Sequence, residues 1–468
     1  MLTGKKLTNK RIAWELLPVI LALAWPTMLE QLLQTAVQYI DTAMVGTLGT
    51  HATAAVGATT TVNWLLASTI SAIGVGFLAY IAQAYGADHK EMAAKASAQA
   101  VFSVLVCGGL FTILCVAVHS YVPVWMQVDT QIQELTGSYF LIVYSPMLAR
   151  TASIVFGTVL RSVGDTKTPM RIGILVNILN VVLNFLLIYP GRWVTVLNLE
   201  MFLPGCGWGV LGAAAATAIS YWVGGVLITI ALFRHPEISP KGHSIRPDLE
   251  VLRPCLRVAL PNALQRFGTS LGYVAFASLI NALGEVATAA HTIANTVESA
   301  FYIPGYGMQT AAATLAGNAY GASDRNKLRQ LAVMINMIEV ILMILSGGLL
   351  FAFAPNMMAL FAADRAVVLL GSVVLRMVAL SEPFYGVSII LEGMMMGMGQ
   401  TKEPFVVNII GMWGIRILGT MFCTVFLNMG LVSAWACMII HNLFLFVIFL
   451  ILYPKMLRKK DYFLENST

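Results

Sequence analysis

The chain has 468 residues, of which 58% are hydrophobic and only 11% charged, and its mean hydropathy is +0.79. Soluble domains carry roughly 25% charged residues, so this composition excludes a soluble globular protein and indicates a polytopic membrane protein. The net charge of +6 is explained below by the position of the basic residues, and no nucleic-acid partner is expected. Six scattered cysteines form no C-x-x-C pair and are expected to be small apolar residues.

The N-terminal segment is not a cleavable signal peptide, because residues 2–11 are polar and basic and the following apolar run is too long. Apolar segments long enough for a membrane-spanning helix, roughly 20 residues, recur twelve times. We therefore expect an all-α polytopic membrane protein with 12 transmembrane helices. The expected spans are about 14–45, 52–83, 93–120, 133–160, 168–189, 209–233, 251–281, 286–317, 327–353, 364–397, 404–427 and 430–453.

The basic residues predict the orientation in the membrane. Of the 28 Lys and Arg, 22 fall on the side of the two termini, Arg161 among them, and two fall on the other side. By the positive-inside rule we expect both termini to be cytoplasmic. We also expect the protein to lie in the inner cell membrane. The remaining four lie inside spans, where long basic side chains can reach an interface; they are Arg150, Arg266, Arg376 and Arg416.

The two halves of the chain are related by a shift of 235 residues, which aligns Pro26 with Pro261. The same shift aligns the AYGA loop at 84–87 with that at 319–322, and GDTKTP at 164–169 with GQTKEP at 399–404. We expect the glycines of these loops to provide left-handed turns. Six helices per repeat is an even number, so two pseudo-symmetric six-helix lobes should share one orientation. The expected units are an N-terminal lobe at 1–234, a cytoplasmic linker with the start of helix seven at 235–258, and a C-terminal lobe at 259–468.

The first span carries two carboxylates, Glu30 and Asp41, on a face that also includes Gln34. Spacings of 4 and 7 residues place these side chains within about 40° of one another around a helix. A charge at the bilayer centre costs roughly 2.5–3.5 kcal/mol, which makes Asp41 the first candidate for coupling to H⁺ or Na⁺. The alternative is that Asp41 only touches headgroups or water. Pro26 should bend this helix, because it removes a backbone hydrogen bond.

A second polar face lies on the fifth span, where Asn177, Asn180 and Asn184 follow one another at helical spacing. These amides could bind Asp41 or offer carbonyl oxygens to an ion. They could equally join helices by ordinary hydrogen bonds. Asp41 aligns with Phe276 in the second repeat, so any such site belongs to one lobe.

The second lobe has its own candidate polar site. His291, Glu298 and Tyr302 lie on one face of the eighth span, and Glu382 precedes Pro383 on the tenth. Arg266, one span earlier, is the available cation for Glu298. A structural Arg266–Glu298 pair and a coupling role both remain open.

Missing motifs narrow the function further. The chain has no G-x-x-x-x-G-K-[ST] sequence for ATP, and neither H-E-x-x-H nor G-x-S-x-G. We therefore expect no enzyme activity, no cofactor and no metal, except that Na⁺ could bind at Asp41. A membrane-embedded enzyme using His291 and Glu298 is the less favoured alternative.

The sequence combines two six-helix halves with Pro26, the YIDTAMVG run that ends at Gly46, the AYGA and GDTKTP loops and the sequence Ala289-Ala290-His291. Together these features resemble the MATE family, the multidrug and toxic compound extrusion transporters. The resemblance covers essentially the whole chain. It implies a monomeric antiporter in the lipid bilayer that exports large, amphipathic, often cationic compounds in exchange for H⁺ or Na⁺. Rocking of two lobes would give alternating access.

Within this family the chain is more similar to the prokaryotic DinF-like branch. The resemblance implies a cation or proton site at Asp41 and Asn180, whereas Asn184 stands where that branch often has a second Asp. In the NorM-like branch carboxylates lie near the positions of Thr269 and Tyr385. A lipid-linked precursor flippase of the same superfamily is the alternative, and the four arginines inside spans keep it open.

Overall fold

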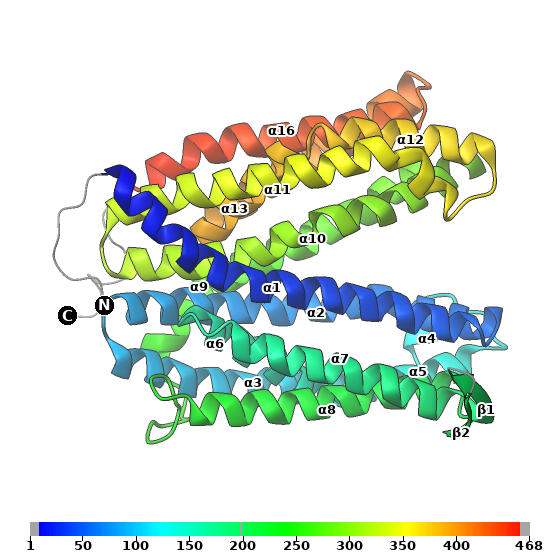
Figure 1. Ribbon diagram of the computed structural model, residues 1–468, viewed down its shortest axis with the longest axis horizontal. Helices are drawn as coiled ribbons and strands as arrows, with labels where there is room; N and C mark the ends of the chain where they lie inside the picture. Colours follow the sequence, from blue (N-terminus) through cyan, green and yellow to red (C-terminus); the bar gives the residue numbers. More distant parts are fainter. Residues whose placement is uncertain (1–8, 197–198, 459–468) are drawn as a thin grey trace.

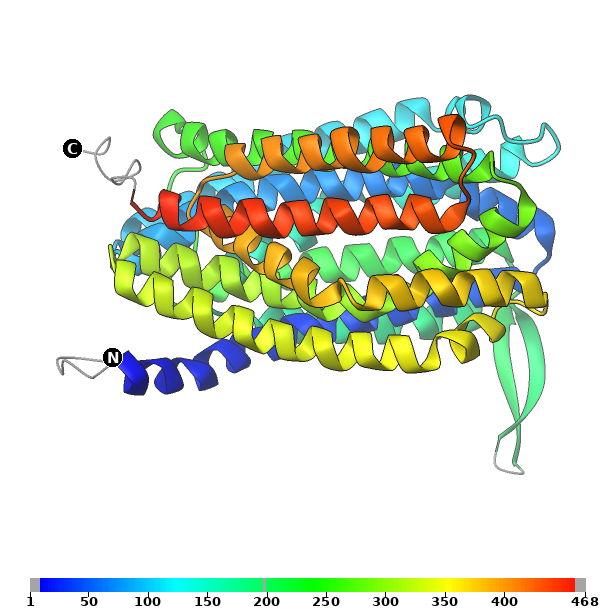
Figure 2. The same cartoon turned by 90° about the horizontal axis from the view of Figure 1, so that it is seen from above.

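The structure is a computed structural model that describes residues 9–196 and 199–458, and most of these form long helices running along one bundle (Figure 1). The helix α1 begins and α16 ends at the same end of the bundle, called here the inner end; the opposite end is the outer end (Figure 2). The first half contains α1 (Asn9–Gly46), α2 (Thr50–Gly86), α3 (Lys90–Val118), α4 (Val122–Trp125), α5 (Gln133–Tyr144), α6 (Met147–Ser162), α7 (Lys167–Ile188), β1 (Pro190–Val196), β2 (Leu199–Cys206) and α8 (Val210–Arg234). The second half contains α9 (Leu249–Asn281), α10 (Glu285–Gly321), α11 (Arg325–Ala359), α12 (Arg365–Ala379), α13 (Glu382–Gly397), α14 (Lys402–Ile409), the π-helix η1 (Ile410–Ile417), α15 (Leu418–Met421), η2 (Phe422–Phe426) and α16 (Leu431–Met456).

The described part of the chain contains eight helices that are long and apolar enough to cross a membrane, or up to ten if each bent pair counts as one span. The bent pairs are α5 with α6, at 46°, and α12 with α13, at 54°. The helices α9 and α10 have 33 and 37 residues but carry several charged and polar groups, which lower their hydropathy. Each of the twelve expected spans therefore has a long helix, a bent pair or a helix with π-turns, and the all-α membrane fold is confirmed.

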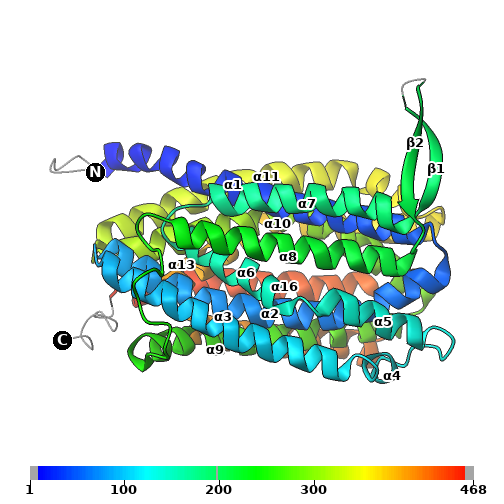
Figure 3. The ribbon, with the colours of Figure 1, turned by 90° about the horizontal axis from the view of Figure 1, so that it is seen from below.

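The sequence did not predict the hairpin formed by β1 and β2. These antiparallel strands pair Trp193 with Phe202, whose rings lie 5.5 Å apart. The hairpin projects sideways from the outer end of the bundle (Figures 2 and 3). The sequence feature that could have predicted the hairpin is the run Val194–Val196, because β-branched and aromatic residues favour strands.

The repeat is visible in the packing between the two halves. α1 packs on α10 and α2 packs on α9, and these two contacts are exchanged by the 235-residue shift. α2 also packs on α10, its own counterpart. The halves are thus related by a pseudo-two-fold axis along the bundle, as expected for repeats of one orientation.

The glycines of the two AYGA loops have a different role from the expected one. Gly86 and Gly321 are the last helical residues of α2 and α10, and the left-handed residues are Asp88 and Ser323. A Cβ on Gly86 would lie 2.7 Å from the Cα of Asn318, and one on Gly321 would lie 2.7 Å from the Cα of Gln83. These glycines therefore allow two helix ends to cross closely.

The glycines of the other repeated loop behave as expected, because Gly164 and Gly399 have φ of 89° and 76°. Left-handed backbone of this kind favours glycine.

Two segments cross the expected boundary between lobes. The beginning of α1 places Leu16, Ile20 and Ala24 in an apolar cluster with α10, α11, α13 and α16. In the connection before α9, Asp248 forms an ion pair with Lys95 of α3, with 2.5 Å between Oδ2 and Nζ. The lobe boundaries themselves stay a prediction.

Candidate functional site

The polar residues of α1 and α7 meet near the outer end of the first half. The amide of Asn184 donates to Asp41 Oδ1 at 2.5 Å and to Asn180 Oδ1 at 3.3 Å. Asn180 in turn donates to the hydroxyl of Thr217 on α8 at 3.4 Å. The structure therefore brings Asp41, Asn180 and Asn184 together, as expected, and adds Thr217. The sequence signal for Thr217 is a lone hydroxyl in an alanine-rich run.

This cluster, Asp41–Asn184–Asn180–Thr217, has the chemistry of a small cation site. Asp41 is half-buried, and the buried Asn184 Oδ1 has no hydrogen-bond partner. A carboxylate and an amide carbonyl are oxygen ligands of the kind that hard cations prefer, and the carboxylate can instead take up a proton. Because a side-chain amide contacts Asp41, its surroundings are more than lipid headgroups and water. Among the described residues no group of three His, Cys, Asp or Glu could hold a metal ion.

Glu30 does not belong to this cluster, which corrects the sequence-based expectation. Its carboxylate accepts two hydrogen bonds from Arg161 Nη2, at 2.6 and 2.7 Å. Eleven residues of helix separate Glu30 from Asp41 by roughly 16 Å along the axis, so one shared face does not make one site. Arg161 is correspondingly not a free basic group of a connection, because its side chain is 16% exposed and ion-paired.

Polar contacts hold the two halves together from the middle of the bundle towards the inner end. Thr27 donates to the carbonyl of Gly307 at 2.8 Å, directly after Pro26. Gln83 donates to the carbonyl of Gly397 at 3.0 Å, and Thr314 to that of Arg161 at 3.1 Å. α1 changes direction within its first half (Figure 1).

Burial along α1 changes in the same direction. Ile20 and Ala24 are fully buried, whereas Tyr39 and Ile40, beside Asp41, are 46% and 40% exposed. The ribbons of the two halves run together towards the inner end and diverge towards the outer end (Figure 1), and Asp41, near the outer end, is half-buried.

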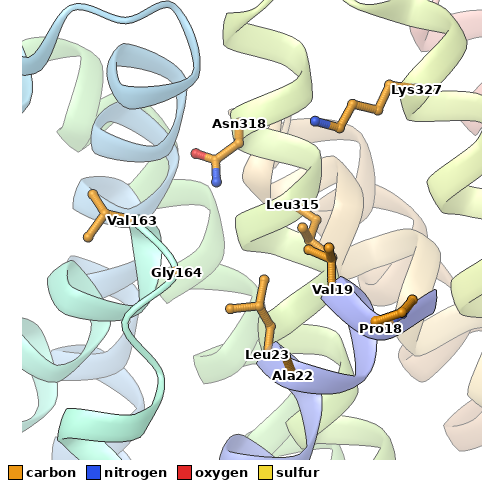
Figure 4. Close-up of a pocket in the computed structure, with 9 residues that line it drawn as sticks. All are labelled: Pro18, Val19, Ala22, Leu23, Val163, Gly164, Leu315, Asn318 and Lys327. Carbon is orange, nitrogen blue, oxygen red and sulfur yellow. The ribbon is translucent and has the colours of Figure 1, made fainter. Parts of the chain in front are cut away.

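A hollow of about 490 Å³ lies near the inner end, between α1, the α6–α7 connection, α10 and α11 (Figure 4). Its lining is mostly apolar, and the Lys327 ammonium points towards Asn318 in this view. The hollow is remote from Asp41, since its α1 residues are Pro18 to Leu23. It marks the junction where the inner ends of the two halves meet.

In the second half, the expected Arg266–Glu298 pair is not formed, and no ion pair joins these two among the described residues. Arg266 Nε donates to Asn262 Oδ1 at 3.0 Å, and the carboxylate within its electrostatic range is Glu392. Glu392 accepts from Gln265 at 2.5 Å. The predicted Arg266–Glu298 pair was wrong because Arg266 donates to Asn262, one turn earlier on its own helix.

Arg416 is the cation near Glu298, and it is buried instead of reaching an interface. It lies on η1, with its guanidinium carbon 4.3 Å from the ring centre of Phe276 and 4.9 Å from that of Tyr273. His291 packs edge-on against Phe276 at 5.5 Å, so it is an aromatic contact in the core and not a partner of Glu298. π-Helical turns are often found at functional sites.

A group of tyrosines lies between α10 and α13. The ring centres of Tyr302 and Tyr306 are 5.7 Å apart, and those of Tyr302 and Tyr385 are 6.0 Å apart. The hydroxyls of Tyr306 and Tyr385 are 3.1 Å apart, and Tyr306 is 36% exposed. Only Tyr302 was a sequence candidate; the other two become visible as a group only when the two helices are paired.

A membrane-spanning helix bundle with two repeated halves, joined at one end and apart at the other, has the architecture of a membrane transporter. The MatE family model matches residues 26–186 and 261–422, so the chain belongs to the MatE family. The two matched segments begin 235 residues apart, which confirms the internal repeat. The chain is therefore a transporter-family protein and not an enzyme.

Curated relatives and solved structures agree with this assignment. The probable multidrug resistance protein NorM of Thermotoga maritima is 26% identical over 91% of this chain and 89% of its own length. The probable multidrug resistance protein YoeA of Bacillus subtilis is 26% identical over 93% of this chain and 92% of its own. An outward-facing multidrug resistance MATE family transporter has the same fold, with a TM-score of 0.85 at 24% identity over 94% of this chain and 96% of that one. The DinF-like branch stays a prediction.

Proposed function

We propose that this protein is a secondary active efflux transporter that exports amphipathic, often cationic compounds in exchange for H⁺ or Na⁺. The observation that carries the proposal is the Asp41–Asn184–Asn180–Thr217 cluster at the outer end of the first half. The names of the relatives, probable multidrug resistance proteins, support the substrate class. The protein is expected to act as a monomer in the inner cell membrane.

The mechanism follows from the orientation that the basic residues predict. With the inner end cytoplasmic, the structure is open outward, and H⁺ or Na⁺ from outside reaches Asp41. When the carboxylate is neutralised, its charge-assisted hydrogen bond from Asn184 becomes an ordinary one, which is about half as strong. The contact between α1 and α7 then changes while the inner part of α1 stays fixed to Gly307 through Thr27.

This difference in attachment makes Pro26 the place where α1 bends. The bend narrows the space between the halves, and bound compound leaves outward. The return step requires the contacts of Thr27, Gln83 and Thr314 to open, so that the inner end becomes accessible. Alternating access thus depends on two sets of contacts: those of Asp41 at the outer end, and those of Thr27, Gln83 and Thr314 towards the inner end.

The tyrosines of the second half are the proposed substrate contact. Tyr306 is 36% exposed, and the faces of tyrosine rings attract organic cations. An aromatic surface binds amphipathic compounds without requiring one hydrogen-bonding pattern, which suits a broad substrate range.

The test is dye efflux from proteoliposomes under an imposed pH gradient and, separately, a Na⁺ gradient. Asp41→Asn should abolish gradient-driven efflux with normal membrane insertion. The matched control is Glu285→Gln, which neutralises an exposed carboxylate in the first turn of α10, at the same end. Full-rate efflux by Asp41→Asn would refute the proposal.

A lipid-linked precursor flippase is the second candidate, and two buried cations favour it. Arg416 and Arg150 are 4% and 7% exposed, and Arg150 lies 5.0 Å from the ring centre of Tyr221. Buried cations could attract the phosphates of such a lipid. Flipping of a fluorescent lipid-linked precursor without any dye efflux would favour this function.

A further inference from the structure

Two of the six cysteines lie against each other near the outer end of the second half. The sulfur atoms of Cys423 on η2 and Cys437 on α16 are 3.9 Å apart. Both thiols are free, and no other pair of cysteine thiols is in contact among the described residues. The sequence did not predict this pair, because its members are 14 positions apart on two different helices.

The end of the eleventh span turns Cys423 towards α16. η2 is a π-helical turn, and the chain after it folds back, with the amide of Met429 donating to the carbonyl of Cys423 at 2.9 Å. Gly419, one turn before Cys423, faces α16 as well, because a Cβ there would lie 3.3 Å from Cys437 Sγ. The absence of a side chain at position 419 therefore leaves room for the Cys437 thiol beside Cys423.

A small movement would join the two sulfur atoms. A disulfide has an S–S distance of about 2.05 Å, so each sulfur would have to move by about 1 Å. Rotation of the side chains and a small shift of the η2 turn can supply a movement of this size. Cys423 is half-buried, whereas Cys437 is only 7% exposed, so Cys423 is the thiol that an external reagent reaches first.

The pair lies on the outer side of the bundle. α16 begins at the outer end (Figure 2), and Cys437 is its seventh residue, about 9 Å along the helix axis from the first. Cys423 is the second residue of η2, shortly before the exposed connection at 427–430. Disulfides persist outside the cytoplasm, where no thiol pool reduces them. The orientation predicted from the basic residues therefore places the pair on the oxidising side of the membrane.

We propose that Cys423 and Cys437 are a disulfide site, oxidised from the outer side by a low-molecular-weight disulfide. The Cys423 thiolate attacks one sulfur of that disulfide, forms a mixed disulfide and releases one thiol. The Cys437 thiolate then attacks the Cys423 sulfur, forms the intramolecular S–S bond and displaces the second thiol. The protein loses two electrons and two protons, and the oxidant gains them as it becomes two thiols.

The bond would fasten the segment with π-turns to the last helix. η1, α15 and η2 all pack on α16. A bond from Cys423 to Cys437 closes a loop of 15 residues, which restricts the unfolded chain and so stabilises the folded one. It joins two elements of one half and leaves the other half free to move. The disulfide site is therefore independent of the proposed efflux function.

Peptide mapping under non-reducing conditions tests the proposal. Reduced wild-type protein, purified in detergent, is incubated with oxidised glutathione and digested. A peptide that links Cys423 to Cys437 should be the main product at these two positions, and the midpoint of thermal unfolding should rise by about 3–6 °C. Separate glutathione adducts on the two cysteines, or two unmodified thiols, in folded protein would overturn the proposal.

A serine variant and thiol trapping in cells complete the test. Cys423→Ser should lose both the linked peptide and the gain in stability, whereas Cys107→Ser, which removes a half-buried thiol of α3, should keep both. Protein from cells whose thiols are blocked with N-ethylmaleimide under denaturing conditions should already contain the linked peptide. If both cysteines are fully alkylated instead, the pair stays reduced in its own membrane, and the proposal is wrong.

Discussion

Replacing Gly86 by alanine should shift the protein away from the state described here. The added Cβ would lie 2.7 Å from the Cα of Asn318 and still closer to its carbonyl oxygen, against at least 3.4 Å for an ordinary contact. The backbone cannot yield as a flexible side chain would, so the ends of α2 and α10 must separate by about 1 Å. Overpacking of this kind costs about 1–3 kcal/mol.

That cost applies to the state in which the inner end is closed. It should therefore change the equilibrium between closed and open inner ends by about 5- to 150-fold. Gly321→Ala introduces the repeat-related clash with Gln83, and the double variant should exceed either single one.

The assay is pulsed electron paramagnetic resonance between spin labels at Lys90 and Arg325, the repeat-related and exposed first residues of α3 and α11. A population with a longer distance should appear in Gly86→Ala. Gly348→Ala in α11 is the control, because nothing lies within 4 Å of its Cβ and it gains only helix propensity. A distance distribution identical to that of the wild type would refute the argument that this crossing holds the inner end closed.

Three further predictions concern stability, pH and substrate. Glu30→Gln leaves Arg161 buried without a counter-charge and should destabilise the detergent-solubilised protein by about 3–5 kcal/mol, measured by thermal unfolding. The double variant Glu30→Gln/Arg161→Gln should recover part of this stability. Strictly additive effects of the two substitutions would contradict a paired contact. The hydrogen bond from Lys90 holds the pKa of the Glu237 carboxyl below its ordinary 4.5, so its attachment of the connection after α8 should be complete above pH 4.5 and be lost as the pH falls through the lowered pKa. Hydrogen exchange of that connection, corrected for intrinsic rates, measures this loss, and Glu237→Gln should exchange fast at every pH. Tyr306→Ala should weaken binding of a cationic dye by about 0.5–2 kcal/mol, whereas the phenylalanine variant should bind normally, and fluorescence titration distinguishes the two.

Much of the fold could be predicted because its signals are local or repeated. Long apolar segments determined the helices, and the 235-residue shift revealed the internal repeat, which the two family-model matches confirm. The crossing of α2 and α10 was not predictable, because a glycine at a helix end has the same sequence signature whether it turns the chain or allows close packing. The two roles can be distinguished only when the partner helix, 235 residues away in the sequence, is in place.

The site was predictable where neighbours share a helix face and lie at one depth. Asn180 and Asn184 are one turn apart and both join the Asp41 cluster. Glu30 and Asp41 point in a similar direction around the helix axis but lie far apart along it. A helical wheel shows only the direction, so it wrongly placed Glu30 in the Asp41 cluster. The burial of Glu382, at the start of α13, was not predictable, because it depends on the packing of α10 and α11 on that helix.

The crossing of Gly86 over Asn318 and of Gly321 over Gln83 has a consequence for the origin of the chain. The same contact is made twice, each time by the same position of one repeat against the same position of the other, as in the self-complementary interface of a symmetric homodimer. A single ancestral glycine would have served both sides of such a dimer. After fusion each copy can mutate alone, so the two halves can carry different residues at equivalent positions, as Asp41 and Phe276 do.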